Sequence, residues 1–210
     1  MAVSRGGFFL TFEGADGSGK STQARKLAAK LKESGKDVVL TREPGGSVGA
    51  EEIRRLLVEG DPGRWSAETE ILLFTAARRD HLERTILPAL ARGAIVISDR
   101  FADSTRVYQG AARADLRTTV DRLHDLMIGQ EPDLTLVIDI DAETGLQRGL
   151  ARNSGEDRFE ELGADFQQKL RIGYRALLTD FPERCLGIDG NNSEYRVAAQ
   201  IMDALKGHLP

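Results

Sequence analysis

One stretch near the amino terminus combines the residue types that bind a chain of phosphates. It consists of Gly14, Ala15, Asp16, Gly17, Ser18, Gly19, Lys20, Ser21 and Thr22. The order fits G-x-x-x-x-G-K-[ST], a loop whose backbone N–H groups surround nucleotide phosphates ahead of a helix N-terminus. Glycine lets this backbone approach the phosphates where a Cβ would obstruct it. We therefore expect phosphate binding over 14–22, with Lys20 on the outer phosphates and the Ser21 hydroxyl on Mg²⁺.

A second candidate group follows the apolar run 94–98. Asp99 and Arg100 come directly after it, so both are expected at the end of a strand. Proteins with a phosphate loop of this kind hold an Asp at such a position near Mg²⁺. The planar guanidinium of Arg100 suits a second phosphate, because it can bind two oxygens at once. The stretch from Phe101 to Gly110 that follows is rich in polar groups, where a substrate would lie.

Two further patterns are less specific. The segment from Arg42 to Gly46 follows the apolar run 37–41 and contains Glu43 and a Pro-Gly-Gly turn. Taken alone, it could be only a turn. Phe74 and Arg78 are four residues apart in a predicted helix, so they share one face and could offer a ring and a cation to one ligand. On spacing alone, Phe74 in the core and Arg78 in solvent is the favoured interpretation.

Basic residues gather again late in the chain. Arg148, Arg152 and Arg158 flank the sequence Asn-Ser-Gly at 153–155. This composition predicts a mobile segment over about 148–162 that closes over phosphates. A solvated surface loop is the alternative interpretation.

A common scaffold must position these groups. Short apolar runs alternate with helical patterns, which predicts an α/β fold with a five-stranded parallel sheet and helices on both faces. The predicted strands are 8–13, 37–41, 94–98, 134–139 and 184–188. Because parallel strands end at a common edge, the charged groups should converge there. A helix is predicted from about Lys20 and another after Ser66, which Pro88 should end or kink.

Composition limits the class of protein. No repeat or linker divides the 210 residues, so a single domain over 1–210 is expected. The net charge of −4 argues against broad nucleic-acid binding, and no apolar run is long enough to span a membrane. Cys185 is the only cysteine and lies in an apolar run, so a buried thiol in a cytoplasmic protein is expected. The histidines at 81, 124 and 208 are scattered and are expected at the surface.

The motifs together resemble the thymidylate kinase family over essentially the whole chain. They are the phosphate loop with Asp16, Arg42 to Gly46, Phe74 to Arg78, Asp99 to Phe101, and Ser104 to Gln109. The resemblance implies a P-loop kinase fold and the ATP-dependent, Mg²⁺-dependent conversion of dTMP to dTDP, a step of dTTP synthesis. It also implies a homodimer whose substrates, dTMP and ATP, are small molecules.

The resemblance further implies roles for individual residues. The residues that contact the thymine base are Phe74, Arg78, Thr105 and Gln109. Tyr108 lies beneath the deoxyribose, and Arg54 and Arg100 bind the acceptor phosphate. Near the acceptor lie Glu43 and Pro44, joined by a cis peptide.

One group of the family carries its charge-stabilising arginine inside the phosphate loop, where this chain has Gly17. The chain therefore resembles the other, bacterial group, which supplies the arginine from the lid. Arg152 and Arg158 are the candidates, with Arg148 as a third. Phosphoryl transfer has a loose, negatively charged transition state, so the catalytic groups should be cations and Mg²⁺ rather than a strong base. The expected catalytic residues are Lys20, Arg100, Arg152, Arg158 and Asp16. The expected metal residues are Ser21, Asp16 and Asp99.

Two other functions stay open from the residues alone. A deoxynucleoside kinase would need a base for a sugar hydroxyl, and Glu13 or Asp99 could serve. A nucleotide-gated binding module would hydrolyse its nucleotide as a switch and have no pocket for a small acceptor.

Overall fold

A five-stranded parallel sheet forms the centre of the computed structural model, which describes residues 6–61, 63–113, 115–150 and 163–209. The strands are β1 (Phe8–Glu13), β2 (Val38–Arg42), β3 (Ile95–Asp99), β4 (Leu134–Asp139) and β5 (Cys185–Asp189). They lie in the order β2-β3-β1-β4-β5. Each predicted strand is confirmed to within one residue at either end. Arg152 and Arg158 lie outside the described residues.

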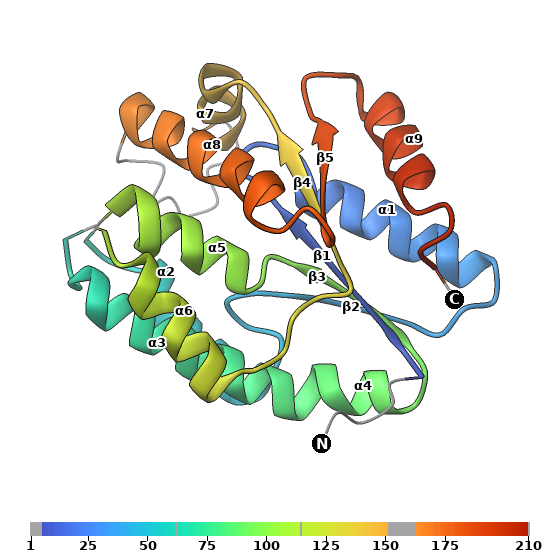
Figure 1. Cartoon of the computed structure of the whole chain (residues 1–210), viewed down its shortest axis with the longest axis horizontal. Helices are drawn as coiled ribbons and strands as arrows, with labels where there is room; N and C mark the ends of the chain where they lie inside the picture. Colours follow the sequence, from blue (N-terminus) through green and yellow to red (C-terminus); the bar gives the residue numbers. More distant parts are fainter. Residues whose placement is uncertain (1–5, 62, 114, 151–162, 210) are drawn as a thin grey trace.

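Helices cover both faces of the sheet (Figure 1). They are α1 (Lys20–Glu33), α2 (Val48–Val58), α3 (Ala67–His81), α4 (Leu87–Ala91), α5 (Ala102–Val107), α6 (Arg117–Met127), α7 (Ala142–Leu150), α8 (Gly163–Asp180) and α9 (Glu194–Ala204). Two π-helical turns, η1 (Leu82–Ile86) and η2 (Tyr108–Arg113), continue α3 and α5. Pro88 lies in the first turn of α4, where its missing N–H is not needed.

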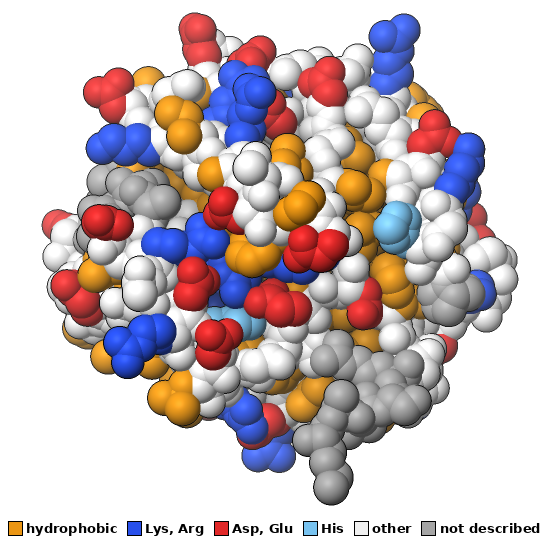
Figure 2. Space-filling view, viewed as in Figure 1, with side chains coloured by type: hydrophobic (Ala, Val, Ile, Leu, Met, Phe, Trp, Pro, Cys, Tyr) orange, Lys and Arg blue, Asp and Glu red, His pale blue; other side chains and the backbone are white. Residues whose placement is uncertain are grey.

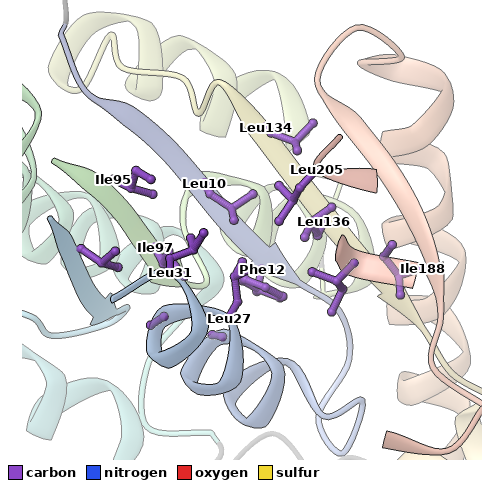
Figure 3. Close-up of a cluster of buried hydrophobic side chains, with 14 of the residues drawn as sticks. Leu10, Phe12, Leu27, Leu31, Ile95, Ile97, Leu134, Leu136, Ile188 and Leu205 are labelled. Atoms are coloured by element: carbon purple, nitrogen blue, oxygen red, sulfur yellow. The ribbon is translucent and has the colours of Figure 1, made fainter. Parts of the chain in front are cut away.

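Alternation along β1 divides the core between the two faces. Leu10 and Phe12 pack with side chains of α1, such as Leu27, and with α9 and its C-cap residue Leu205 (Figure 3). Phe9, which points to the opposite face, packs with side chains of η1, α4 and the turn after β3. Successive strand residues point to opposite faces, so this single strand anchors both helical layers.

The chain reverses direction across the sheet around β1. After β1 it passes to β2 at the edge, returns to β3, and then places β4 on the other side of β1. Phe12 is paired with Asp99 across β1 and β3. In open α/β sheets, ligands bind beyond the carboxyl ends of the strands at such a switch point. The phosphate loop and the Asp99–Arg100 turn are therefore neighbours.

Helix α8 was not predicted from the sequence. It buries Phe166, Leu170, Tyr174 and Leu177, which are spaced three or four residues apart and form a cluster with Val107 and Cys185. The prediction that Cys185 is buried is confirmed, and burial raises the pKa of its thiol to about 12.

The described surface mixes charges of both signs. Acidic and basic side chains are interspersed on the face that Figure 2 shows. Among the described residues, no helical segment combines the length and apolar character that crossing a bilayer requires.

Candidate active site

The phosphate loop joins β1 to α1 through a left-handed backbone. Gly14, Gly17 and Gly19 have φ values of 145°, 77° and 90°, a region that side chains with a Cβ rarely adopt. Lys20 is the first residue of α1, and its Nζ donates to the carbonyl oxygen of Ala15 at 3.2 Å. The loop thus ends at a helix N-terminus, the arrangement that binds phosphate oxygens.

Gly17 also lies against a neighbouring helix. A Cβ at this position would be 2.0 Å from the carbonyl oxygen of Gly145 in α7. Neither the backbone conformation nor the space permits a side chain here unless α7 moves. An arginine at position 17 is therefore sterically excluded in this arrangement of α7.

A cavity opens beside the phosphate loop. Its lining consists of Asp16, Glu43, Pro44, Arg54, Val58, Phe74, Arg78, Arg100, Phe101, Ser104, Thr105, Tyr108 and Gln109. All nine residues expected at the acceptor belong to this lining. They come from the β2–α2 loop, α2, α3, the turn after β3, α5 and η2, so only the fold brings them together. Asp16 belongs to both the loop and the cavity.

At one end of the cavity, Arg78 is buried in an ion pair. Its Nε donates to Oε2 of Glu43 at 2.7 Å, and its Nη2 donates to the carbonyl oxygen of Phe101 at 3.1 Å and to Oγ1 of Thr105 at 3.0 Å. The guanidinium also lies over the Phe101 ring, 5.2 Å from its centroid. The side chain is only 4% exposed, so the interpretation of Arg78 as a solvated charge was wrong. Phe74, one turn earlier, is half-buried and lines the cavity.

The other carboxylate oxygen of Glu43 contacts a buried histidine. Oε1 lies 2.9 Å from Nδ1 of His81, whose Nε2 lies 2.7 Å from Oγ1 of Thr41. Burial by itself would raise the pKa of Glu43, but Arg78 and His81 outweigh it and hold the pKa below its ordinary value. The expectation of surface positions was wrong for His81 and for His124, both buried, and right for His208. The Glu43–Pro44 peptide is cis, as the resemblance implied.

At the other end, Arg100 faces the phosphate loop. Its φ is 72°, the one positive value at a non-glycine residue in the described part of the chain. Nη2 donates to Oδ1 of Asp16 at 2.5 Å, and the guanidinium lies over the Tyr108 ring, 5.1 Å from its centroid. The Tyr108 hydroxyl donates to Oδ2 of Asp16 at 2.7 Å. Burial raises the pKa of Asp16, but Arg100 and Lys20 outweigh it and hold the pKa well below its usual range.

Glu13 lies beneath this end of the cavity. Its carboxylate accepts from the backbone N–H of Phe101 at 2.7 Å and from Oγ of Ser104 at 2.6 Å. Burial and the charge of Asp103 raise its pKa to about 7. Because Glu13 has no exposed surface, it cannot reach a sugar hydroxyl as a general base. It instead fixes the turn that carries Arg100.

Two of the three residues expected near Mg²⁺, Asp99 and Ser21, fit such an ion. Oδ1 of Asp99 is buried and has no hydrogen-bond partner among the described residues. Asp99 and Ser21 line the same hollow, between α1 and the β2–α2 loop. Mg²⁺ in kinases is held by one or two protein oxygens together with substrate phosphates and water.

Three residues of the cavity lining, and Tyr174 beside it, were not predicted to have a role. Val58 and Phe101 line it without a role having been expected. Ser104 lies within a quoted motif but was given no role. Tyr174, whose hydroxyl oxygen lies 2.8 Å from Nη1 of Arg100, belongs to α8. No sequence signal pointed to Tyr174, because its partner is 74 positions away.

Comparisons with known proteins give a consistent result. A family model described as thymidylate kinase matches residues 12–201. The chain belongs to the thymidylate kinase family. Thymidylate kinases transfer a phosphoryl group from ATP to dTMP and so form dTDP. A thymidylate kinase from Dinoroseobacter shibae is 66% identical over 200 residues, which cover 95% of this chain and 97% of that protein.

Two more thymidylate kinases extend the match. One from Ruegeria pomeroyi is 64% identical over 207 residues, covering 99% of this chain and 98% of that protein. The crystal structure of a thymidylate kinase from Ehrlichia chaffeensis superposes with a TM-score of 0.77 at 36% identity, covering 95% and 98% of the two chains. The predicted α/β P-loop kinase fold is thereby confirmed.

Proposed function

We propose that the cavity holds dTMP and that the phosphate loop brings the γ-phosphate of ATP into line with its phosphate. The observation that carries this proposal is the Asp16–Arg100 pair, which links the loop to the cavity at 2.5 Å. In-line transfer requires the donor and acceptor phosphates to be adjacent. A cavity that shares a residue with the phosphate loop meets this requirement.

The thymine base occupies the end of the cavity at Arg78. Phe74 supplies a ring for stacking, and the base edge lies against Arg78, Thr105 and Gln109. Support comes from the fixed state of Arg78, which Glu43 and Phe101 hold from two sides. Groups held in place before the ligand arrives bind it with less loss of conformational entropy.

The acceptor phosphate lies at Arg54 and Arg100, and the deoxyribose lies over Tyr108. A phosphate monoester has a second pKa of about 6, so at neutral pH it is mostly ionised and needs no general base. The problem that remains is electrostatic, because two polyanions must be held together. The cations of this end and the backbone donors of the loop provide the necessary charge.

The donor side is assigned to the phosphate loop, with Lys20 as the cation on the transferred group. Ser21, Asp99 and Asp16 organise Mg²⁺ and its water ligands; when bound, the ion neutralises charge on the donor phosphates. A lid over about 148–162 supplies the remaining cation from Arg152 or Arg158. The steric exclusion at Gly17 supports this assignment.

A homodimer is part of the proposal. Leu72 on α3 is 59% exposed, and Leu126 and Met127 on α6 are 78% and 43% exposed. Helices α3 and α6 pack against each other, so these apolar side chains lie on adjoining elements. Exposed apolar patches mark interfaces more often than free surface. A cytoplasmic location and the single-domain organisation over 1–210 stay predictions.

A coupled assay tests the function directly. Purified protein with ATP and Mg²⁺ should convert dTMP to dTDP and should leave thymidine unchanged. dTMP should also raise the melting temperature without ATP, which a nucleotide-gated module lacking an acceptor pocket would not show. Phosphorylation of thymidine alone, or no turnover of dTMP, would contradict the proposal.

A further inference from the structure

Tyr174, on α8, contacts two residues that line the cavity, Arg100 and Ser104. Its hydroxyl oxygen lies 2.8 Å from Nη1 of Arg100 and 3.0 Å from Oγ of Ser104. The side chain is buried, and α8 runs beside α5 (Figure 1). A Cβ on Gly173 would be 2.9 Å from a methyl group of Val107, so this glycine allows the close approach of the two helices.

The direction of these hydrogen bonds follows from the number of protons available. Ser104 has one hydroxyl proton, which it donates to Oε2 of Glu13 at 2.6 Å. The Tyr174 hydroxyl must then donate to Ser104, and its oxygen accepts from Arg100. A single chain of hydrogen bonds therefore joins the guanidinium, through two hydroxyl groups, to a buried carboxylate.

The partners of the two terminal nitrogens of Arg100 differ in charge. Nη2 is held by the carboxylate of Asp16, while Nη1 donates to neutral oxygens of Tyr174, Ser104 and the Gly14 backbone. A neutral acceptor fixes a guanidinium without cancelling its charge, which a second carboxylate would do. The neutral oxygens thus orient the Arg100 guanidinium, and of these partners only Asp16 reduces its charge.

We propose that Tyr174 is a positioning residue, which holds Arg100 toward the acceptor phosphate and leaves its positive charge available. The inference rests on the proposed function, in which Arg100 binds that phosphate. Tyr174 itself touches Arg100 and Ser104, so it acts through them.

The test compares Tyr174→Phe with a matched control, Tyr195→Phe. The first substitution removes the hydroxyl and keeps the buried ring; the second removes a hydroxyl from a side chain that is 83% exposed on α9. We expect Tyr174→Phe to lower kcat/KM for dTMP about ten- to a hundredfold, the usual cost of a misplaced group. KM for ATP should change little, and Tyr195→Phe should match the wild type in every parameter.

A second arm asks whether the effect passes through Arg100. In an Arg100→Lys background, Tyr174→Phe should add no more than about a twofold loss, because coupled residues are not additive. If Tyr174→Phe lowered kcat/KM for dTMP in the Arg100→Lys background as much as it does in the wild type, the inference would be overturned. Wild-type kinetics of the Tyr174→Phe single variant would overturn it as well. If thermal unfolding shows that Tyr174→Phe is not folded, Ser104→Ala is tested in its place. We expect the same loss of kcat/KM for dTMP, and wild-type kinetics of Ser104→Ala would overturn the inference.

The outcome separates this inference from the proposed function. A wild-type enzyme that turns over dTMP while Tyr174→Phe is unimpaired would overturn the positioning role alone. A wild-type enzyme that leaves dTMP unchanged would contradict the function on which the role depends.

Discussion

The two ends of the cavity hold their arginines in different ways. Arg78, at the base end, is only 4% exposed and is neutralised by Glu43, with further bonds to Phe101 and Thr105. Arg100, at the phosphate end, is 14% exposed and has one carboxylate partner, Asp16. Its other partners are neutral oxygens.

The difference matches the ligand groups proposed for each end. A base is neutral, so the cation beside it needs its own counter-charge when no ligand is present. A phosphate is an anion, so a cation that is held mainly by neutral groups keeps its attraction for it. The comparison indicates that the two ends differ in how far their arginines are neutralised. The arginine at the base end is paired with a carboxylate of its own, whereas the arginine at the phosphate end keeps more of its charge for the proposed ligand.

The largest expected effect concerns the phosphate end, where the comparison predicts that charge is limiting. Arg152→Ala or Arg158→Ala should lower kcat by about three to five powers of ten if that residue contacts the transferred phosphoryl group, the range measured for arginine fingers. KM for dTMP should change far less. Single-turnover and steady-state kinetics of both variants measure this. Near-normal kcat in both would show that the lid assignment is wrong.

The next effect concerns the base end and appears in stability. Glu43→Ala removes one member of a buried ion pair and leaves Arg78 and His81 without their shared acceptor. We expect the free energy of unfolding to fall by about 3–5 kcal/mol. Urea unfolding measures the change, with the exposed Glu52→Gln as control. A loss below about 1 kcal/mol would contradict the view of this end as a tightly paired site.

The smallest effect concerns Glu13, which supports the phosphate end from below. Its pKa of about 7 lies above the ordinary 4.5, so between these values the folded protein binds one proton more than the unfolded chain. The resulting stabilisation is complete below about pH 4.5, declines as the pH rises, and is lost above about pH 7. It amounts to roughly 3 kcal/mol.

Glu13→Gln should remove that decline, because an amide does not titrate and its oxygen can still accept from the backbone N–H of Phe101. Relative to the wild type, the variant should therefore gain stability between pH 5 and pH 8 in urea unfolding, and Glu52→Gln should not. Parallel pH profiles of all three proteins would show that Glu13 does not titrate in this range.

Local patterns predicted the elements that carry strong short-range signals. The five strands and the loop over 14–22 are continuous in the sequence, and Ser66 caps α3 by accepting from the N–H of Thr69, as its position suggested. Helix α8 was missed because the basic segment before it dominated the interpretation of that region. Its apolar stripe, which includes Leu170 and Leu177, has the helical spacing that could have revealed it.

Burial of charge was the other failure, and its cause is distance along the chain. Arg78 looked solvated because its counter-ion, Glu43, is 35 positions away on a different element. His81 looked exposed for the same reason, since its partners lie on β2 and the loop after it. Spacing within one helix describes a face of that helix and says nothing about what the face meets.

The amino-acid sequence by itself determined the five strands, the phosphate loop and the family, because each depends on residues that are near one another or on motifs in a fixed order. Only the tertiary structure decided which charges are neutralised, which hydroxyl groups contact Arg100, and why position 17 has no room for a side chain. Those properties depend on contacts between elements far apart in the chain, and such contacts exist only once the sheet has brought the elements to one edge.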